Sequence, residues 1–472
     1  MRTVTAAFGC LLCALAFAGA AAGAVFGVAD DAGKYADDGG NSFFATLNDL
    51  GMTENRVTVL WDPASPTTIT DQAFLDRSVP KAVRHGVDLV FAIYPAKARA
   101  LVDTPNGLQL FAQFAARVAA RYPQVTKIIC LNEGNQPRFQ QPQYDDSGNG
   151  VAGGIQEAAM AACYDALKAV NPAIDVIGFG FSPHGNDDAS APSNVSHSPI
   201  RLLEEIGNAY RASGRTLPIA DDVSVHCYPR SNTDAPSVGF GWPNVGCANL
   251  DRFKQAWWDT FHGTAQPVFR EAGDGPGGYV RAYIDESGYQ AAIPADKAGI
   301  YSGSENVPTI TEQQQAEFYA QMIAWAACDQ DVAELNFFHL IDEGPLPALQ
   351  TGLEFADGTH RASYDAVKAA IAANQQCHGT EVAWRHTNRV VGAKAKLRGR
   401  RLVLSAAEGY SYSIAVGRAT RRLSAVSGIG PANADLELKL PRLPHGTYRL
   451  VVRVSAETNP DRITTFTKRF RV

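Results

Sequence analysis

The sequence lacks an excess of positive charge. Its 472 residues include 42 Lys and Arg against 48 Asp and Glu, which gives a formal net charge of −6. Proteins that bind the phosphate backbone of nucleic acids need a basic face, and this balance describes an ordinary soluble surface instead. Nucleic acid is therefore not an expected partner.

Long apolar runs are also missing beyond the N-terminus, so no membrane span is expected. The N-terminus combines a basic Arg2, an apolar run over residues 6–17 and small residues that end at Ala24. This order is typical of a secretory signal peptide, because the apolar core is too short for a membrane anchor. Residues 1–24 are thus predicted to be removed, and the mature chain to be secreted.

The mature chain has no Cys-x-x-Cys pair, which disfavours a zinc or redox site. Six cysteines remain after the signal peptide, and an even number in an oxidising compartment favours disulfides. The elements that each bridge would join predict three pairs: Cys227–Cys247, Cys328–Cys377 and Cys130–Cys163.

Strand-like and helix-like segments alternate along most of the chain. Continuous apolar, β-rich runs suit parallel strands covered on both faces, and they begin near residues 25, 56, 87, 127, 175, 223, 281 and 333. Amphipathic helical patterns follow them, beginning near residues 41, 70, 107, 153, 198, 249, 311 and 363.

Eight such units predict an α/β fold, a (β/α)8 TIM barrel over residues 25–378. A doubly wound sheet is the alternative. It would normally carry a glycine-rich phosphate turn after the first strand, and VADDAGKYADDGG is not one.

The pattern changes after the barrel segment. Short alternating runs between Gly, Pro and Asn turns predict a small antiparallel β-sandwich over residues 385–472. This segment has a basic cluster, which either contacts an anionic cell wall or polysaccharide or is only a solvated face. The second interpretation is favoured, since charge runs usually just solvate. The cluster comprises Arg398, Arg400, Arg401, Arg418, Arg421 and Arg422.

Acidic residues end two of the predicted strands, where a barrel of this kind carries its catalytic groups. The fourth strand ends in Asn132 and Glu133, and the seventh in Asp285 and Glu286. Glycosidic cleavage needs one carboxylic acid to protonate the leaving oxygen and one carboxylate to attack or to activate water. Each residue alone could simply cap a helix or pair with Arg, so the joint placement carries the hypothesis.

These strand ends resemble those of the large clan of retaining barrel glycoside hydrolases, which includes cellulases, β-xylosidases, α-L-iduronidases and β-glucuronidases. RYPQVTKIICLNEGNQPRFQQP is similar to the fourth-strand segment, where NEPN is usual, although Gly134 replaces the proline. YIDESGYQ resembles the seventh-strand segment TEFG, with Ser287 in place of the aromatic residue. RVTVLWDP and HCYP resemble the second- and sixth-strand segments.

The resemblance implies a retaining double displacement with Glu133 as acid/base and Glu286 as nucleophile. It also implies that Asn132 binds the hydroxyl next to the anomeric centre, that Tyr228 holds Glu286, and that Arg56 lies beneath it. No cofactor or metal is expected: a metal-dependent barrel hydrolase would want His-x-His on an early strand, and a Schiff-base aldolase a Lys at a strand end.

Aromatic residues at strand ends and in loops are the expected platforms for sugar rings. The residues assigned to substrate binding are Asn132, Arg56, Trp61, His226, Tyr228, Trp242 and Tyr289, and Tyr94, Phe139 and Tyr301 lie in comparable positions. His226 has a competing interpretation as a core histidine. A competing hypothesis for the whole chain is a secreted carbohydrate-binding protein that kept the barrel and lost catalysis.

Overall fold

The computed structural model describes the chain from residue 23 onward, except for residues 272–273, 275–277, 376, 378–388, 391, 407–408, 419–420, 432–433 and 458–461. Nearly all of the predicted signal peptide therefore lies outside the described residues. So do the predicted domain boundaries at residues 378 and 385.

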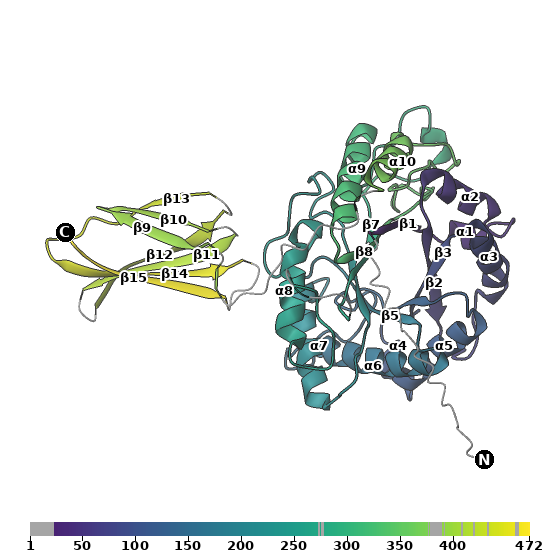
Figure 1. Ribbon diagram of the computed structural model, residues 1–472, viewed down its shortest axis with the longest axis horizontal. Helices are drawn as coiled ribbons and strands as arrows, with labels where there is room; N and C mark the ends of the chain where they lie inside the picture. The colour runs from purple at the N-terminus through teal and green to yellow at the C-terminus, as the bar shows by residue number, and fades with distance from the viewer. Residues whose placement is uncertain are drawn as a thin grey trace, which may run out of the picture.

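Eight parallel strands form a closed barrel in sequence order, which confirms the predicted (β/α)8 fold over the doubly wound sheet (Figure 1). The central strands are almost entirely buried, as their continuous apolar runs predict. The strands are β1 (Val25–Ala29), β2 (Glu54–Trp61), β3 (Asp88–Pro95), β4 (Lys127–Cys130), β5 (Asp175–Phe181), β6 (Asp222–His226), β7 (Ala282–Ser287) and β8 (Val332–Phe337).

Helices surround the barrel and bury an apolar stripe against its strands (Figure 1). Among the described residues, none of the helices is both long and apolar enough to cross a bilayer. The main helices are α2 (Asn41–Leu50), α3 (Gln72–His85), α5 (Gly107–Arg121), α6 (Ala152–Val170), α7 (Pro199–Ser213), α8 (Leu250–Phe261), α9 (Glu312–Cys328) and α10 (Ala362–Asn374), with short α1 (Ala32–Tyr35) and α4 (Ala100–Asp103).

The interior of the barrel is filled by side chains, so that it is a packed core and not a channel. Val90, Ala92, Ile129, Ile177 and Tyr283 are among the residues of an inner cluster distinct from the larger core under the helices. A substrate can therefore be held only outside the barrel, in the loops at the strand ends.

The C-terminal segment forms two antiparallel sheets, which confirms the predicted β domain (Figure 1). Their inward residues, such as Leu402, Ile414 and Val452, make a separate hydrophobic core. The strand orders are β13-β10-β9 and β12-β11-β14-β15. The strands are β9 (Lys394–Arg398), β10 (Arg401–Ser405), β11 (Tyr410–Arg418), β12 (Arg421–Gly430), β13 (Leu436–Lys439), β14 (Thr447–Ala456) and β15 (Ile463–Arg471).

Two of the three predicted disulfides are present, Cys227–Cys247 and Cys328–Cys377, and both are compatible with an extracellular protein. The third prediction is wrong, because Cys130 and Cys163 are free thiols. Both are fully buried between β4 and α6, where they pack as small apolar side chains. Burial raises the pKa of the Cys163 thiol well above its ordinary value, so the thiolate that forms a disulfide is disfavoured.

Candidate active site

A cavity of about 1120 Å³ opens at the carboxyl ends of the barrel strands. Residues from distant parts of the chain line it, including both glutamates that the sequence assigns to catalysis. Glu133 follows β4 and Glu286 lies in β7, and Arg56, Asn132 and Tyr228 also reach the cavity. The barrel thus brings together five residues that the sequence spreads over more than 200 positions.

The backbone after β4 leaves the regular strand conformation. Leu131 and Glu133 have φ angles of 75° and 39°, in the left-handed region that residues other than glycine rarely adopt. The amide of Glu133 donates to the carbonyl of Gly180 in β5 at 2.7 Å, which holds the turn. In a regular strand neighbouring side chains point to opposite sides, whereas here Asn132 and Glu133 both line the cavity.

Two neighbours of Glu133 fix this turn. Gly134 lies so close to the buried Gln156 of α6 that an added Cβ would stand 2.3 Å from its side chain. Asn135 is fully buried, and its amide bonds the backbone of Ser182 in both directions and the carbonyl of His197. The glycine that replaces the usual proline therefore leaves room for the side-chain amide of Gln156.

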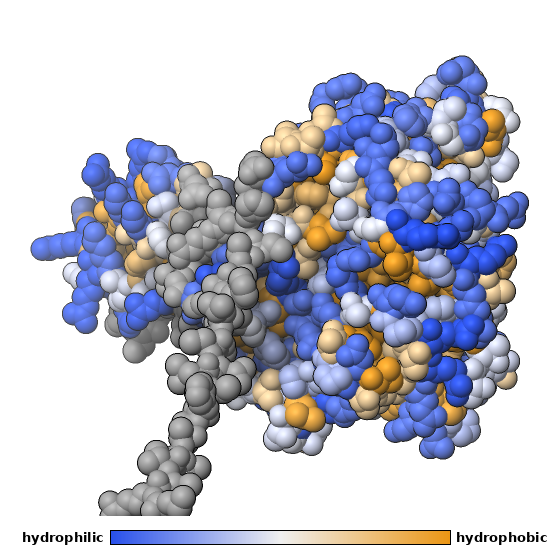
Figure 2. All heavy atoms as spheres, turned by 45° about the vertical axis from the view of Figure 1, so that its right-hand side comes forward, coloured by the Kyte–Doolittle hydropathy of each residue, from blue (hydrophilic) through white to orange (hydrophobic). Residues whose placement is uncertain are grey.

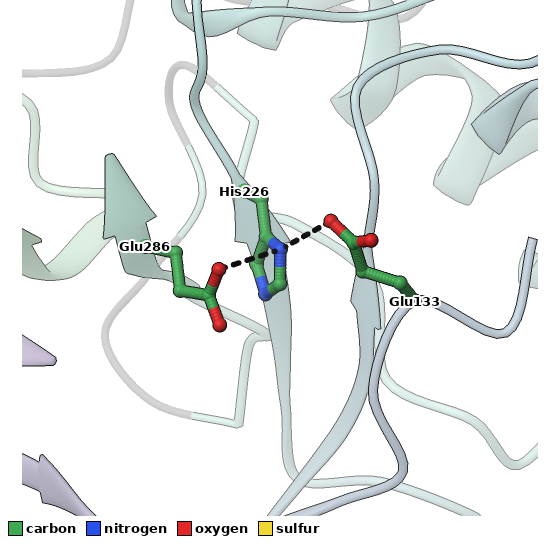
Figure 3. Close-up of side chains that lie close together, drawn as sticks. All are labelled: Glu133, His226 and Glu286. Carbon is green, nitrogen blue, oxygen red and sulfur yellow. Dashed lines mark hydrogen bonds and ion pairs between the residues drawn. The ribbon is translucent and has the colours of Figure 1, made fainter. Parts of the chain in front are cut away.

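His226 lies between the two glutamates (Figure 3). Its Nδ1 is 2.8 Å from Oε1 of Glu133 and 3.4 Å from Oε2 of Glu286. One carboxylate oxygen of each glutamate and a ring nitrogen of His226 all lie within 4.8 Å of one another. A positively charged ring in this position interacts favourably with an ionised glutamate on either side.

The pKa of His226 supports that role. Burial lowers the pKa of this imidazole, but the nearby carboxylates of Glu286 and Asp285 outweigh burial and raise the pKa well above 6.5. The ring therefore carries a proton on each nitrogen at neutral pH, and Nδ1–H donates to Glu133. The same three residues have the spacing of a metal site, and a metal bound there would have to displace the ring proton of His226.

Glu286 receives two donors. The hydroxyl of Tyr228 donates to Oε2 at 3.0 Å, and Nη2 of Arg56 lies 3.0 Å from Oε1. Burial and the Glu286 carboxylate raise the pKa of Tyr228 well above its ordinary value, so that the hydroxyl keeps its proton. Arg56 also donates to Oδ1 of Asn132 at 2.9 Å. Both oxygens of the Glu286 carboxylate are thus held in place by donors.

Asp285 anchors these donors from below, a role that the sequence analysis missed. It is fully buried, accepts from the hydroxyl of Ser224, and lies 3.4 Å from Arg56 and 3.6 Å from His226. Burial raises the pKa of Asp285, but His226 and Arg56 outweigh burial and hold the pKa below its usual value. The sequence shows Asp285 next to Glu286 on a strand. It does not show which of these two side chains points into the cavity.

No protein-family model matches this sequence, and no curated protein matches it. Solved structures do match. A family 39 glycoside hydrolase from Bacteroides cellulosilyticus WH2 aligns with a TM-score of 0.50 at 15% identity, covering 89% of this chain and 79% of that chain. The chain has the fold of barrel glycoside hydrolases.

Two further glycoside hydrolases align less well. A monomeric β-xylosidase from Caulobacter crescentus CB15 has a TM-score of 0.45 at 12% identity, covering 88% of this chain and 94% of that chain. A β-glucuronidase from Bacteroides uniformis has a TM-score of 0.43 at 13% identity, covering 95% of this chain but 45% of that chain. At such identities the likeness to glycoside hydrolases concerns the fold.

Glycoside hydrolases need surfaces for sugar rings, and the aromatic residues that the sequence suggested for this role are only partly in place. Trp61 and Tyr289 are not such surfaces, because their side chains are buried: Trp61 packs against Phe111 of α5, and Tyr289 against Phe318 of α9. Trp242 packs against the main core and does not line the cavity. The aromatic residues that do line it are Tyr94, Phe139, Tyr228 and Phe338.

Several polar residues that the sequence analysis did not assign to the site also line the cavity of this glycoside hydrolase fold. Asp30 is the best anchored, since its carboxylate accepts from the amides of Ala32, Leu340 and Ile341. The others include Asp31, Gln136, Arg138, His184, His339, Asp342 and Glu343. They provide hydrogen-bonding groups from the segments that follow β1, β4, β5 and β8.

Proposed function

We propose that the protein is a glycoside hydrolase that cleaves O-glycosidic bonds of a poly- or oligosaccharide with retention of configuration. The observation that carries the proposal is the glutamate pair: oxygens of Glu133 and Glu286 lie within 4.8 Å of each other in one cavity. Retaining enzymes place their two carboxyl groups about 5–5.5 Å apart, and inverting enzymes about 6.5–9.5 Å apart.

In the first step Glu133 protonates the glycosidic oxygen while a carboxylate oxygen of Glu286 attacks the anomeric carbon. The bond to the leaving sugar breaks, and a covalent glycosyl ester forms on Glu286. In the second step Glu133, now a carboxylate, takes a proton from water. The water oxygen attacks the same carbon, the ester bond breaks, and Glu286 returns as a carboxylate.

The surrounding groups suit these two roles. Tyr228 and Arg56 donate to Glu286 and orient its carboxylate for attack. Asn132, held by Arg56, is placed to donate its amide to a sugar hydroxyl that enters the cavity.

The test is a screen of polysaccharides and aryl glycosides with wild type and Glu286→Gln. We expect turnover in the wild type and a loss of more than about 10³-fold in the variant, with substrate binding retained. Glu343→Gln is the matched control, because it neutralises another carboxylate of the same cavity. Equal activity in wild type and Glu286→Gln would refute the assignment of the nucleophile.

The stereochemistry of the first product tests the mechanism separately. Proton NMR during the first minutes of hydrolysis should show the anomer of the substrate, because two inversions at one carbon restore the configuration. The opposite anomer would refute the double displacement. If the wild type binds a carbohydrate but turns over none of the substrates in the screen, the hypothesis of a carbohydrate-binding protein is favoured instead.

A further inference from the structure

The C-terminal domain has a charge opposite to that of the rest of the chain. Residues 389–472 contain 17 Lys and Arg against five Asp and Glu, whereas residues 1–388 contain 25 against 43. Figure 2 shows hydrophilic side chains that project from this domain into solvent. A net charge of this size on a small domain attracts polyanions and repels other basic groups.

Four arginines of this domain lie on one sheet face. Side chains alternate across a strand, and the buried residues Tyr448, Leu450, Val452 and Val454 of β14 point into the sandwich. Arg449 and Arg453 therefore point outward from β14. The register pairs Arg449 with Arg469 and Thr447 with Arg471, so both β15 arginines share this side. We call this outward side, with Arg449, Arg453, Arg469 and Arg471, the arginine face.

The rest of the arginine face is made of hydroxyl-bearing, small and aliphatic residues, and the aliphatic ones are Val451, Ile463 and Ile429. Its positions carry neither an acidic nor an aromatic side chain in the described parts of β11, β14 and β15, or over residues 425–429 of β12. The hydroxyl-bearing residues are Ser411, Ser413, Ser427, Thr447, Ser455, Thr465 and Thr467. The face thus offers donors in abundance and no internal counter-charge.

All four arginines are exposed, and within the part of the chain that the structure describes none of them forms an ion pair. Arg449 and Arg469 are directly opposite each other across two strands, an arrangement in which like charges repel. An anionic ligand would relieve this repulsion. The outward side of the other sheet is also basic, but it carries an acidic residue, Glu437, which is paired with Arg401.

The geometry points to an acidic polysaccharide: we propose that the arginine face binds a polymer with a carboxylate on successive sugars. Guanidinium groups bind carboxylates through two parallel hydrogen bonds, and the hydroxyls between them can bond sugar hydroxyls. Arg449 and Arg453 are about 14 Å apart along β14, which spans more than one sugar unit. A single-stranded nucleic acid or a neutral glycan would want aromatic platforms, which this face lacks.

The choice of a polysaccharide over another polyanion rests on the proposed function, since the barrel would then act on the polymer that this domain holds. Binding by the arginine face nevertheless stands apart from catalysis and is measured apart from it. The full-length chain carrying Glu286→Gln serves as the reference protein, so that no probe is degraded during the measurement.

The probes are polygalacturonate and its methyl ester, which have the same backbone but differ in charge. We expect the reference protein to be retarded by polygalacturonate in affinity electrophoresis, not by the ester, and less as salt is added. Replacing the arginine face by Arg449→Ser, Arg453→Ser, Arg469→Ser and Arg471→Ser should weaken binding by at least about tenfold.

The matched control removes the same number of charges from the other sheet. Lys394, Lys396, Arg398 and Lys439 all point outward there, and changing each to Ser should weaken binding much less. Equal loss in both quadruple variants would overturn the assignment to the arginine face. Tighter retention on double-stranded DNA, or on vesicles of phosphatidylcholine with phosphatidylglycerol, would overturn the choice of a polysaccharide.

Circular dichroism and thermal unfolding check that the variants fold. If the serine variant fails to fold, the four Arg→Lys changes keep the charge and remove only the planar guanidinium. They should still weaken binding, because an ammonium group cannot form the paired hydrogen bonds. Undiminished binding in the lysine variant would overturn the role of the arginine side chains as carboxylate receptors.

Discussion

Buried acids near the mouth of the barrel carry pKa values that the sequence alone does not indicate. Glu354 is nearly buried beside a second cavity, and burial together with the neighbouring Asp30 raises its pKa from 4.5 to about 7. The exposed His360 lies 3.6 Å away, where water screens its charge. Glu354 is therefore protonated in the folded protein over a range in which the unfolded chain has released that proton.

This difference predicts how stability changes with pH. Between pH 4.5 and about 7 the folded state binds more protons, so the free energy of unfolding falls as pH rises. Over this range the free energy of unfolding of the wild type should fall by about 3 kcal/mol more than that of Glu354→Gln. Urea unfolding of wild type and variant at pH 4.5, 6 and 7.5 measures the difference. The same pH dependence in both proteins would contradict the prediction.

The sequence predicted which side chains reach the cavity only where their place at a strand end was enough to decide it. Glu133 and Glu286 end strands, and both reach the cavity. Trp61 also ends a strand, but its side chain points outward under α5, because a shift of one residue reverses the face. The same ambiguity hid the role of Asp285, which lies beside Glu286 and points away from the cavity lining.

The segment after β4 packs closely against α6. Gly134 and Gln156 of α6 approach so closely that a methyl group at residue 134 cannot fit without movement. Gly134→Ala should therefore lower the free energy of unfolding by about 1–3 kcal/mol. It should also reduce turnover, because Glu133 precedes the displaced residue.

The control shortens the side chain of Gln156, which faces residue 134. Adding Gln156→Ala to Gly134→Ala should restore much of the lost stability, with an interaction energy of about 1 kcal/mol or more in a double-mutant cycle. Chemical unfolding of the four proteins gives this energy. Additive effects of the two changes would show that the close approach is not what the alanine disturbs.

Whole elements were predictable in proportion to their burial. All eight barrel strands lie where continuous apolar runs predict them, since strands covered on both faces exclude polar residues. β12 and β15 are harder to recognise in the sequence. Both are edge strands of their sheet, and their sequences, RRLSAVSGIG and ITTFTKRFR, are rich in charged and small residues, as exposed edges tend to be.

At the scale of the molecule, two disulfides restrain different parts of the chain. Cys328–Cys377 joins the end of α9 to the segment after α10 and closes a loop of 49 residues. Changing both cysteines to Ala should lower the free energy of unfolding by about 2–4 kcal/mol, because the unfolded chain regains entropy. Turnover should change little, since neither cysteine is near the cavity.

Denaturant unfolding and initial rates of the double variant measure the two effects. The comparison is the variant in which Cys227 and Cys247 are both Ala, whose loop of 20 residues is shorter. It should lose less stability but more activity. A larger loss of turnover from the Cys328–Cys377 variant would contradict this division between the two bridges.

The position of Cys227 has a further consequence. It stands between His226, which bonds Glu133, and Tyr228, which bonds Glu286. Closing its bridge to Cys247 therefore restrains the partners of both glutamates at once. In a chain still inside a reducing cell this restraint would be absent. The two glutamates would then lack a restraint on their hydrogen-bond partners that the oxidised protein provides.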